Sequence, residues 1–131
     1  IQKQPTYERW LQRKAAAHIR RDRRRGNTTA TQAEYKEAIH GAICESEGVD
    51  AYTGENLDWS LISKYNNEAS KAHRREYKKK FGMLPSVDHV GDGTGPADFR
   101  ICGWRTNDCK NDLNLDELLA FCQLIIEKNR K

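Results

Sequence analysis

Several features that mark other classes of protein are missing from this sequence. No apolar run approaches the length of a membrane-spanning helix, and no signal-peptide pattern opens the chain. The cysteines, Cys44, Cys102, Cys109 and Cys122, include no closely spaced pair. This spacing argues against a zinc ribbon and favours free thiols in a reducing compartment. Because internal repeats and low-complexity linkers are also absent, we expect one domain.

The charged residues are numerous and unevenly distributed. Charged residues make up 32% of the 131 residues and hydrophobic ones 37%, which predicts a small core under a heavily ionised surface. The formal net charge is only +4, a mild excess, but the basic residues concentrate in segments 20–25 and 74–80. We expect a cytoplasmic protein of bacterial or phage origin. Since the first residue is Ile1 rather than Met, an upstream targeting segment stays possible.

Apolar spacing and capping residues predict helices at both ends of the chain. Thr6 can cap a first helix that runs to Gly26, and a Thr-x-x-Glu capping box opens a second helix over 31–48. A third helix is predicted over 63–80 and a last one over 114–131. The last helix is expected to bury its apolar side chains, which are Leu118, Leu119, Phe121, Cys122, Ile125 and Ile126.

Extended structure is predicted in the middle of the chain. Segments 84–90 and 99–102 have the composition of short strands, and the Gly- and Pro-containing segment 92–96 forces a loop between them. A short helix should begin at Arg105 or Thr106. Earlier, Thr53-Gly54 favours a tight turn between two short extended segments. The predicted class is α+β, mainly helical.

The candidate chemistry lies between Ser86 and Leu113. His89 can accept a proton near neutral pH, and the adjacent Asp88 offers a hard oxygen ligand for Mg²⁺ or Mn²⁺. On a regular strand these two side chains point to opposite faces, so a twist or bulge would be needed to bring them into one site. Asn107 and Asn111 share one face of the following helix and could complete a metal shell. Taken singly, an Asp-His pair is common, and an Asn near a helix start is often a cap.

The order of these residues resembles the HNH nucleases of the ββα-metal, or His-Me finger, group. The resemblance covers about residues 44–113 and is carried by Val87-Asp88-His89, the Gly-rich loop, Asp98 through Cys102, and Asn107 with Lys110. It implies a ββα-metal finger of a short antiparallel hairpin plus helix. Residues 1–43 would then form a basic helical part, 44–113 the finger core and 114–131 a C-terminal helix.

The resemblance assigns a role to each site residue. His89 matches the general base, and Asp98 stands where the family has the Asn that orients that base. Asp88 and Asn107 match the metal ligands, with Asn111 as a further ligand one turn later. The family's flanking zinc-binding cysteine pairs are absent. One divalent ion is implied, with Mg²⁺ expected and Mn²⁺, Zn²⁺ or Ni²⁺ as alternatives.

The resemblance therefore predicts a metal-dependent endonuclease acting on DNA, with RNA as an alternative substrate. Contacts to phosphate are expected from five basic residues, which are Arg23, Arg24, Arg25, Arg105 and Lys110. Two other interpretations stay open. The chain could be a nucleic-acid-binding module that kept the finger but lost catalysis, or an interaction domain in which the Asp-His pair is only a buried hydrogen bond.

Overall fold

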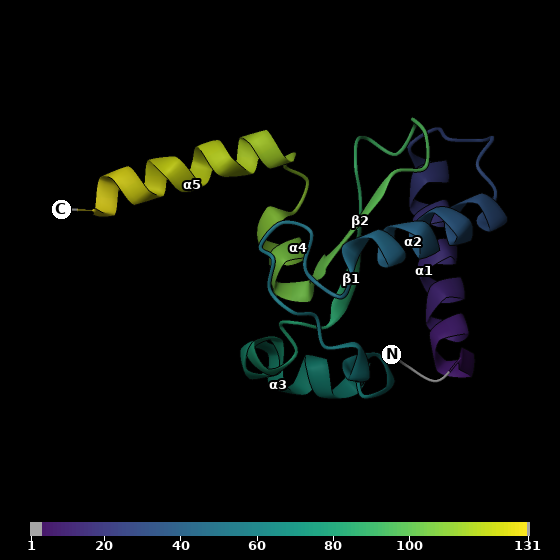
Figure 1. The fold of residues 1–131 in the computed structure, drawn as a ribbon, viewed down its shortest axis with the longest axis horizontal. Helices are drawn as coiled ribbons and strands as arrows, with labels where there is room; N and C mark the ends of the chain where they lie inside the picture. Colours follow the sequence, from purple (N-terminus) through teal and green to yellow (C-terminus); the bar gives the residue numbers. More distant parts are fainter. Residues whose placement is uncertain (1–3, 131) are drawn as a thin grey trace.

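A two-stranded antiparallel hairpin lies between helices in the computed structural model, which describes residues 4–130 (Figure 1). The elements in chain order are α1 (Gln4–Arg24), α2 (Gln32–Ser46), η1 (Trp59–Ser63), α3 (Asn67–Lys80), β1 (Pro85–His89), β2 (Phe99–Gly103), α4 (Trp104–Lys110) and α5 (Leu115–Asn129). The prediction of a mainly helical α+β fold is confirmed. Within the described residues, no helix is both long and apolar enough to cross a membrane.

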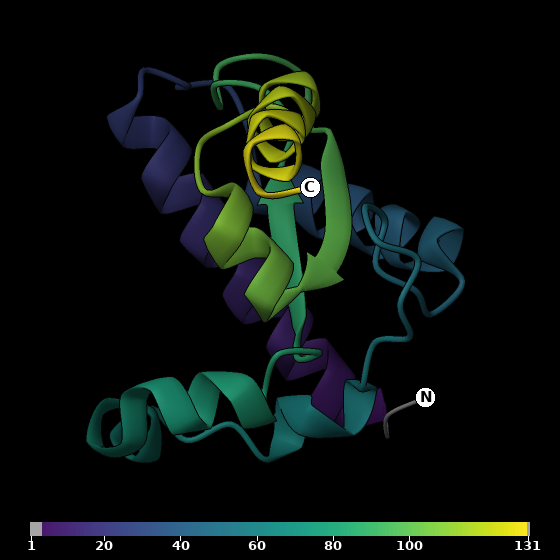
Figure 2. The same ribbon diagram turned by 90° about the vertical axis from the view of Figure 1, so that its left-hand side faces the viewer.

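The two faces of the hairpin serve different neighbours. The strands pair without interruption, from Pro85 opposite Gly103 to His89 opposite Phe99. Since side chains alternate along a strand, Val87 and Ile101 point with Phe99 into the core that α1 and α2 complete. The opposite face meets α4, which lies in front of and beside β1 in Figure 2. The hairpin therefore separates an apolar layer from a polar one.

The core between α1 and α2 follows the predicted apolar spacing. Trp10, Leu11 and Ile19 of α1 are buried, as are Tyr35 and Ile39 of α2. The predicted capping box of α2 is confirmed, because Thr31 and Glu34 satisfy each other's backbone N–H groups. The start of α1 differs from the prediction: α1 begins at Gln4, so Thr6 lies inside the helix and does not cap it.

The helix predicted over 63–80 begins four residues late, as α3 at Asn67. A separate short helix, η1, precedes it and ends at Ser63. The break is stabilised locally because the Asn66 side chain accepts from Ala69 N at 3.0 Å and the Tyr77 hydroxyl accepts from Asn66 N at 2.7 Å. Capping at Asn66 thus starts the helix later than the residue pattern indicates.

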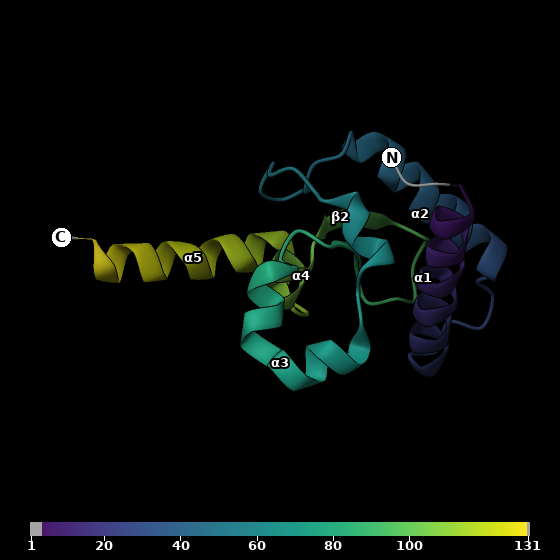
Figure 3. The ribbon, with the colours of Figure 1, turned by 90° about the horizontal axis from the view of Figure 1, so that it is seen from below.

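The prediction that the last helix buries its apolar side chains is wrong. Helix α5 does begin with the predicted capping box at Asn114 and Glu117, but it projects away from the hairpin (Figures 1 and 3) and none of its residues is buried. Phe121 is 55% exposed and Leu119 is 56% exposed. Periodicity identifies an apolar face but not the surface that covers it.

Asp50 joins the turn after α2 to the junction of β2 and α4. Its buried carboxylate accepts hydrogen bonds from Gly103 N at 2.8 Å, Thr106 Oγ1 at 2.7 Å, Tyr52 N at 2.8 Å and Thr53 N at 3.0 Å. Burial alone would raise the pKa of this carboxyl, but the hydrogen bonds hold the pKa below its ordinary value. One side chain therefore fixes where α4 starts.

Replacing Asp50 with Ala should unfold the protein more readily. The change leaves several buried donors unpaired, and we expect a loss of about 3 kcal/mol in the free energy of unfolding. Asp58→Ala is the matched control, because Asp58 is an exposed cap that accepts from Ser60 N, and it should cost about 1 kcal/mol. Urea unfolding of both variants measures the difference; equal losses would contradict the role of Asp50.

A buried histidine should make stability depend on pH. His18 lies between α1 and the hairpin, with Nδ1 2.8 Å from Arg21 Nη2. Burial, followed by the nearby Arg21 and His89, lowers its pKa to about 4. A lowered histidine pKa means that the unfolded chain binds the proton more readily, so stability is full above the unfolded value and declines as the pH falls toward the folded value.

We expect wild type to lose about 2 kcal/mol through this group between roughly pH 7 and pH 5. His18→Gln should flatten that slope, whatever its effect on stability at pH 7. Urea unfolding at several pH values gives both slopes, and parallel slopes would show that His18 is not the titrating group.

Candidate active site

His89 is held by a carboxylate from the end of α1. Its Nδ1 lies 2.7 Å from Asp22 Oδ2, and both side chains are only 1% exposed. An ionised carboxylate can only accept hydrogen bonds, so Nδ1 carries the hydrogen and Nε2 keeps its lone pair in the neutral imidazole. Nε2 lies 3.5 Å from Pro96 O. Because a carbonyl oxygen is also an acceptor, it leaves that lone pair available to a proton.

Further partners fix Asp22 in place. The Tyr35 hydroxyl donates to Asp22 Oδ2 at 2.7 Å, and Arg21 Nε approaches Oδ1 at 3.5 Å. Burial and the hydrogen bond to Asp22 raise the pKa of Tyr35 to about 12. The rings of Tyr35 and Phe99 pack against the imidazole of His89. These contacts set the orientation of both members of the His89–Asp22 pair.

The loop between the strands closes over this pair. Asn27 Nδ2 donates to Gly93 O at 3.0 Å, which attaches the loop to the segment after α1. Gly93 has a φ of +89°, and a Cβ atom there would lie 2.4 Å from Asp22 Oδ1. Only glycine fits both the backbone conformation and the close approach. The loop therefore covers the imidazole of His89.

Asp88 points to the other side of β1. Its Oδ2 accepts from the Tyr52 hydroxyl at 2.6 Å and lies 3.0 Å from Lys110 Nζ, and Lys110 is itself buried. Burial and the hydrogen bond to Asp88 raise the pKa of Tyr52 far above its ordinary value. The strand is regular at this point, so the bulge that would bring Asp88 and His89 onto one face is absent.

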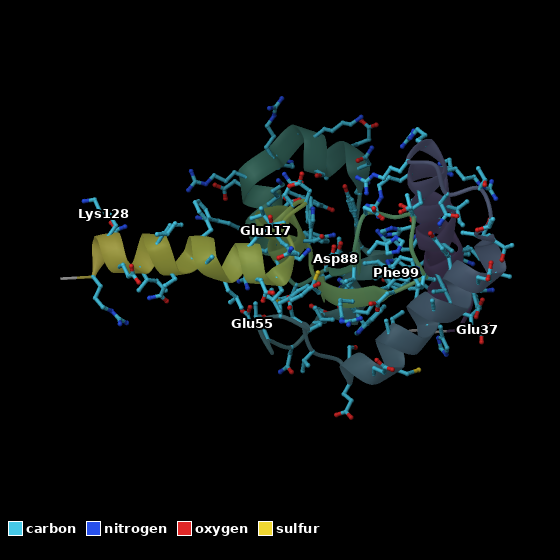
Figure 4. All side chains as sticks on the ribbon, turned by 90° about the horizontal axis from the view of Figure 1, so that it is seen from above. Glu37, Glu55, Asp88, Phe99, Glu117 and Lys128 are labelled. Atoms are coloured by element: carbon cyan, nitrogen blue, oxygen red, sulfur yellow. The ribbon has the colours of Figure 1, made fainter. Side chains whose placement is uncertain are left out.

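Both residues nevertheless border one cavity at the end of the hairpin. The cavity has a volume of about 490 Å³. Figure 4 shows Asp88 between Phe99 and the start of α5, where Glu117 is labelled. Charged side chains and Asn111 line this cavity. The basic ones are Arg21, Arg25, Arg100 and Lys110, and the acidic ones are Asp88, Asp92, Asp112 and Glu117. The guanidinium groups of this lining could bind phosphates, and its carboxylates could bind a cation.

The side chains of this cavity offer few ligands for a metal ion. Among the described residues, no group of three or more His, Cys, Asp or Glu side chains could enclose a metal ion. Mg²⁺, however, is commonly held by one or two carboxylates, with waters and substrate phosphates completing its shell. Asp88 and Asn111 line the cavity and provide a carboxylate and an amide. In this structure the Asp88 carboxylate is instead paired with the Lys110 ammonium and the Tyr52 hydroxyl.

Three residues predicted for the site lie elsewhere. Asn107 donates from Nδ2 to Ser86 Oγ at 2.8 Å and lines a different cavity, beside Trp104. Asp98, expected to orient the base, instead pairs with Arg100 in an exposed ion pair. Arg105 pairs with Glu55. The carboxylate beside His89 is that of Asp22, so the expected contact between Asp98 and His89 is replaced.

The other four basic residues predicted to contact phosphate divide between two places. Arg25 and Lys110 line the cavity, whereas Arg23 and Arg24 are exposed on the last turn of α1. Of the cysteines, Cys102 is buried and the other three are exposed, and all four are free.

Sequence reasoning missed Asp22, Tyr35 and the role of Tyr52. Asp22 is the lone acid within an arginine-rich segment, and a buried acid in a basic segment is a signal for a specific partner. The sequence pattern indicates only that Tyr35 and Tyr52 are apolar positions, because nothing in it shows where a tyrosine hydroxyl points.

Comparison with known proteins adds no family assignment. No family model matches the chain, and neither a curated protein nor a solved structure matches it.

Proposed function

We propose that this chain is a divalent-metal-dependent endonuclease of the HNH type that hydrolyses phosphodiester bonds in DNA. The observation that carries the proposal is the His89–Asp22 pair, in which Nε2 retains an available lone pair. His89 also borders a cavity that arginines and Asp88 line. The order of residues in the ββα-metal resemblance supports the same assignment.

His89 serves as the general base. Its Nε2 accepts a proton from the attacking water, and Asp22 stabilises the imidazolium that forms. Pro96 O, 3.5 Å away, becomes a hydrogen-bond acceptor once Nε2 is protonated. Because the His89 side chain is 1% exposed, the loop that carries Gly93 and Pro96 must move for water and substrate to reach it.

Asp88 and Asn111 are the residues that would hold the cation, with Asn107 as a third ligand if it exchanges its contact with Ser86. A bound divalent ion supplies stabilisation of negative charge on the phosphate and the leaving oxygen. Lys110, 3.0 Å from Asp88 Oδ2, neutralises the carboxylate when no cation is bound. Mg²⁺ is the ion that these oxygen donors favour.

Arginines around the cavity would hold the substrate backbone. Arg21, Arg25 and Arg100 line it, and a guanidinium can bind a phosphate through two parallel hydrogen bonds. Arg23 and Arg24 continue the basic surface along the end of α1. Such contacts bind backbone without reading base sequence, so affinity should fall steeply with salt.

A second candidate is a nucleic-acid-binding module without catalytic activity. The buried ion pair between Asp88 and Lys110 and the covered imidazole of His89 favour it. This candidate predicts salt-dependent binding to DNA with no metal-dependent cleavage. The two candidates are therefore separated by one cleavage assay.

The first test is plasmid cleavage in the presence of Mg²⁺ or Mn²⁺. Wild type should nick or linearise the plasmid, and chelator should abolish the reaction. His89→Ala should reduce the rate by roughly 100-fold or more, because a positioned general base contributes on that order. His73→Ala is the matched control, since His73 is exposed on α3, and it should cleave like wild type.

Cleavage by His89→Ala at the wild-type rate would remove the general-base assignment. Binding of a labelled duplex without cleavage by any protein would favour the binding module instead. Cleavage of an RNA substrate in preference to DNA would keep the chemistry and change the substrate.

The second test asks which carboxylate supports His89. Asp22→Asn removes the charge that fixes Nδ1–H, and we expect the cleavage rate to fall by about 100-fold with an altered pH profile. Asp98→Asn changes only an exposed partner of Arg100 and should leave the rate and the pH profile unchanged. Thermal melts of both variants check that each is folded. The opposite order of effects would return the supporting role to Asp98.

A further inference from the structure

Helix α5 carries an apolar seam that nothing in the described chain covers. At 3.6 residues per turn, Leu118, Leu119, Ile125 and Ile126 flank Cys122 on one side of the helix. Ile125 is 48% exposed and Ile126 is 44% exposed. Single exposed apolar residues are ordinary, but an uninterrupted seam of this size on a projecting helix marks an interaction surface.

We propose that α5 pairs with α5 of a second copy of this chain, antiparallel, to form a homodimer. The seam runs along the full helix, Leu115–Asn129, whose midpoint is Cys122. A self-complementary seam of this kind meets its own copy across a two-fold axis. Cys122 of one copy then lies beside Cys122 of the other.

The charges of α5 favour the antiparallel orientation. Its first turn carries Asp116 and Glu117, whereas Lys128 in the last turn and Arg130 after it outnumber Glu127 at the far end. Antiparallel pairing brings the acidic end of one helix beside the basic end of the other and also opposes the two helix dipoles. Parallel pairing would place like ends together.

The position of α5 permits this arrangement. Figure 4 shows Glu117 where α5 leaves the rest of the molecule and Lys128 near the distant end of the helix, and Figure 3 shows α5 extending outward with no other element along it. In an antiparallel pair the two molecular bodies therefore lie at opposite ends of the helix pair. The helix is about 22 Å long, so the interface is at the small end of specific interfaces, and we expect reversible association in the micromolar range.

Sedimentation equilibrium of the full chain tests the association. Wild type should approach twice the monomer mass of 15.1 kDa as its concentration rises. Leu119→Glu combined with Ile126→Glu should raise the dissociation constant by at least ~100-fold, because two charges per copy would enter the seam. Leu124→Glu is the matched control: Leu124 is 65% exposed but lies on the opposite side of the helix from Cys122, so dimerisation should persist.

Cross-linking tests the orientation. With Cys44 and Cys109 replaced by Ser, a short bismaleimide should join two copies through Cys122. In the Cys122→Ser background, Leu115→Cys should not cross-link, since antiparallel copies separate the two positions by about 21 Å. A monomer at every concentration, equal effects of the seam and control variants, or efficient cross-linking through position 115 would each overturn the proposal.

Discussion

The buried contact between Asp22 and His89 is the interaction on which the arrangement of the site depends. It joins the last turn of α1 to the last residue of β1, 67 positions apart in sequence. A buried charge of this kind is stable only when its hydrogen bonds are satisfied, and Tyr35 and Arg21 provide them. Gly93 must then remain small, because any Cβ would meet Asp22. The helical layer, the hairpin and the loop are thereby fixed relative to one another.

A second carboxylate organises the other face of the hairpin. Asp50 gathers donors from the turn after α2 and from the start of α4, which places Lys110 against Asp88. The two faces of β1 thus take part in separate polar networks: His89 contacts α1, and Ser86 and Asp88 contact α4. The proposed nuclease uses both where the strand ends and the two networks border one cavity.

Helix α5 differs from the rest of the chain in where its apolar side chains lie. The hairpin, α1 and α2 bury their apolar side chains within one molecule, whereas α5 leaves its seam exposed. A helix stabilised by its capping box alone is marginal at this length in water. Pairing with a second copy would supply the packing that the single chain does not.

The sequence by itself determined the mainly helical α+β class, the hairpin, two capping boxes and the candidate residues Asp88 and His89, because period and capping are local properties of neighbouring residues. Tertiary structure decided the rest. It placed Asp22 rather than Asp98 beside His89, turned Asn107 toward Ser86, and left α5 uncovered. Each of these outcomes depends on which distant element packs against a residue, and no local spacing specifies that.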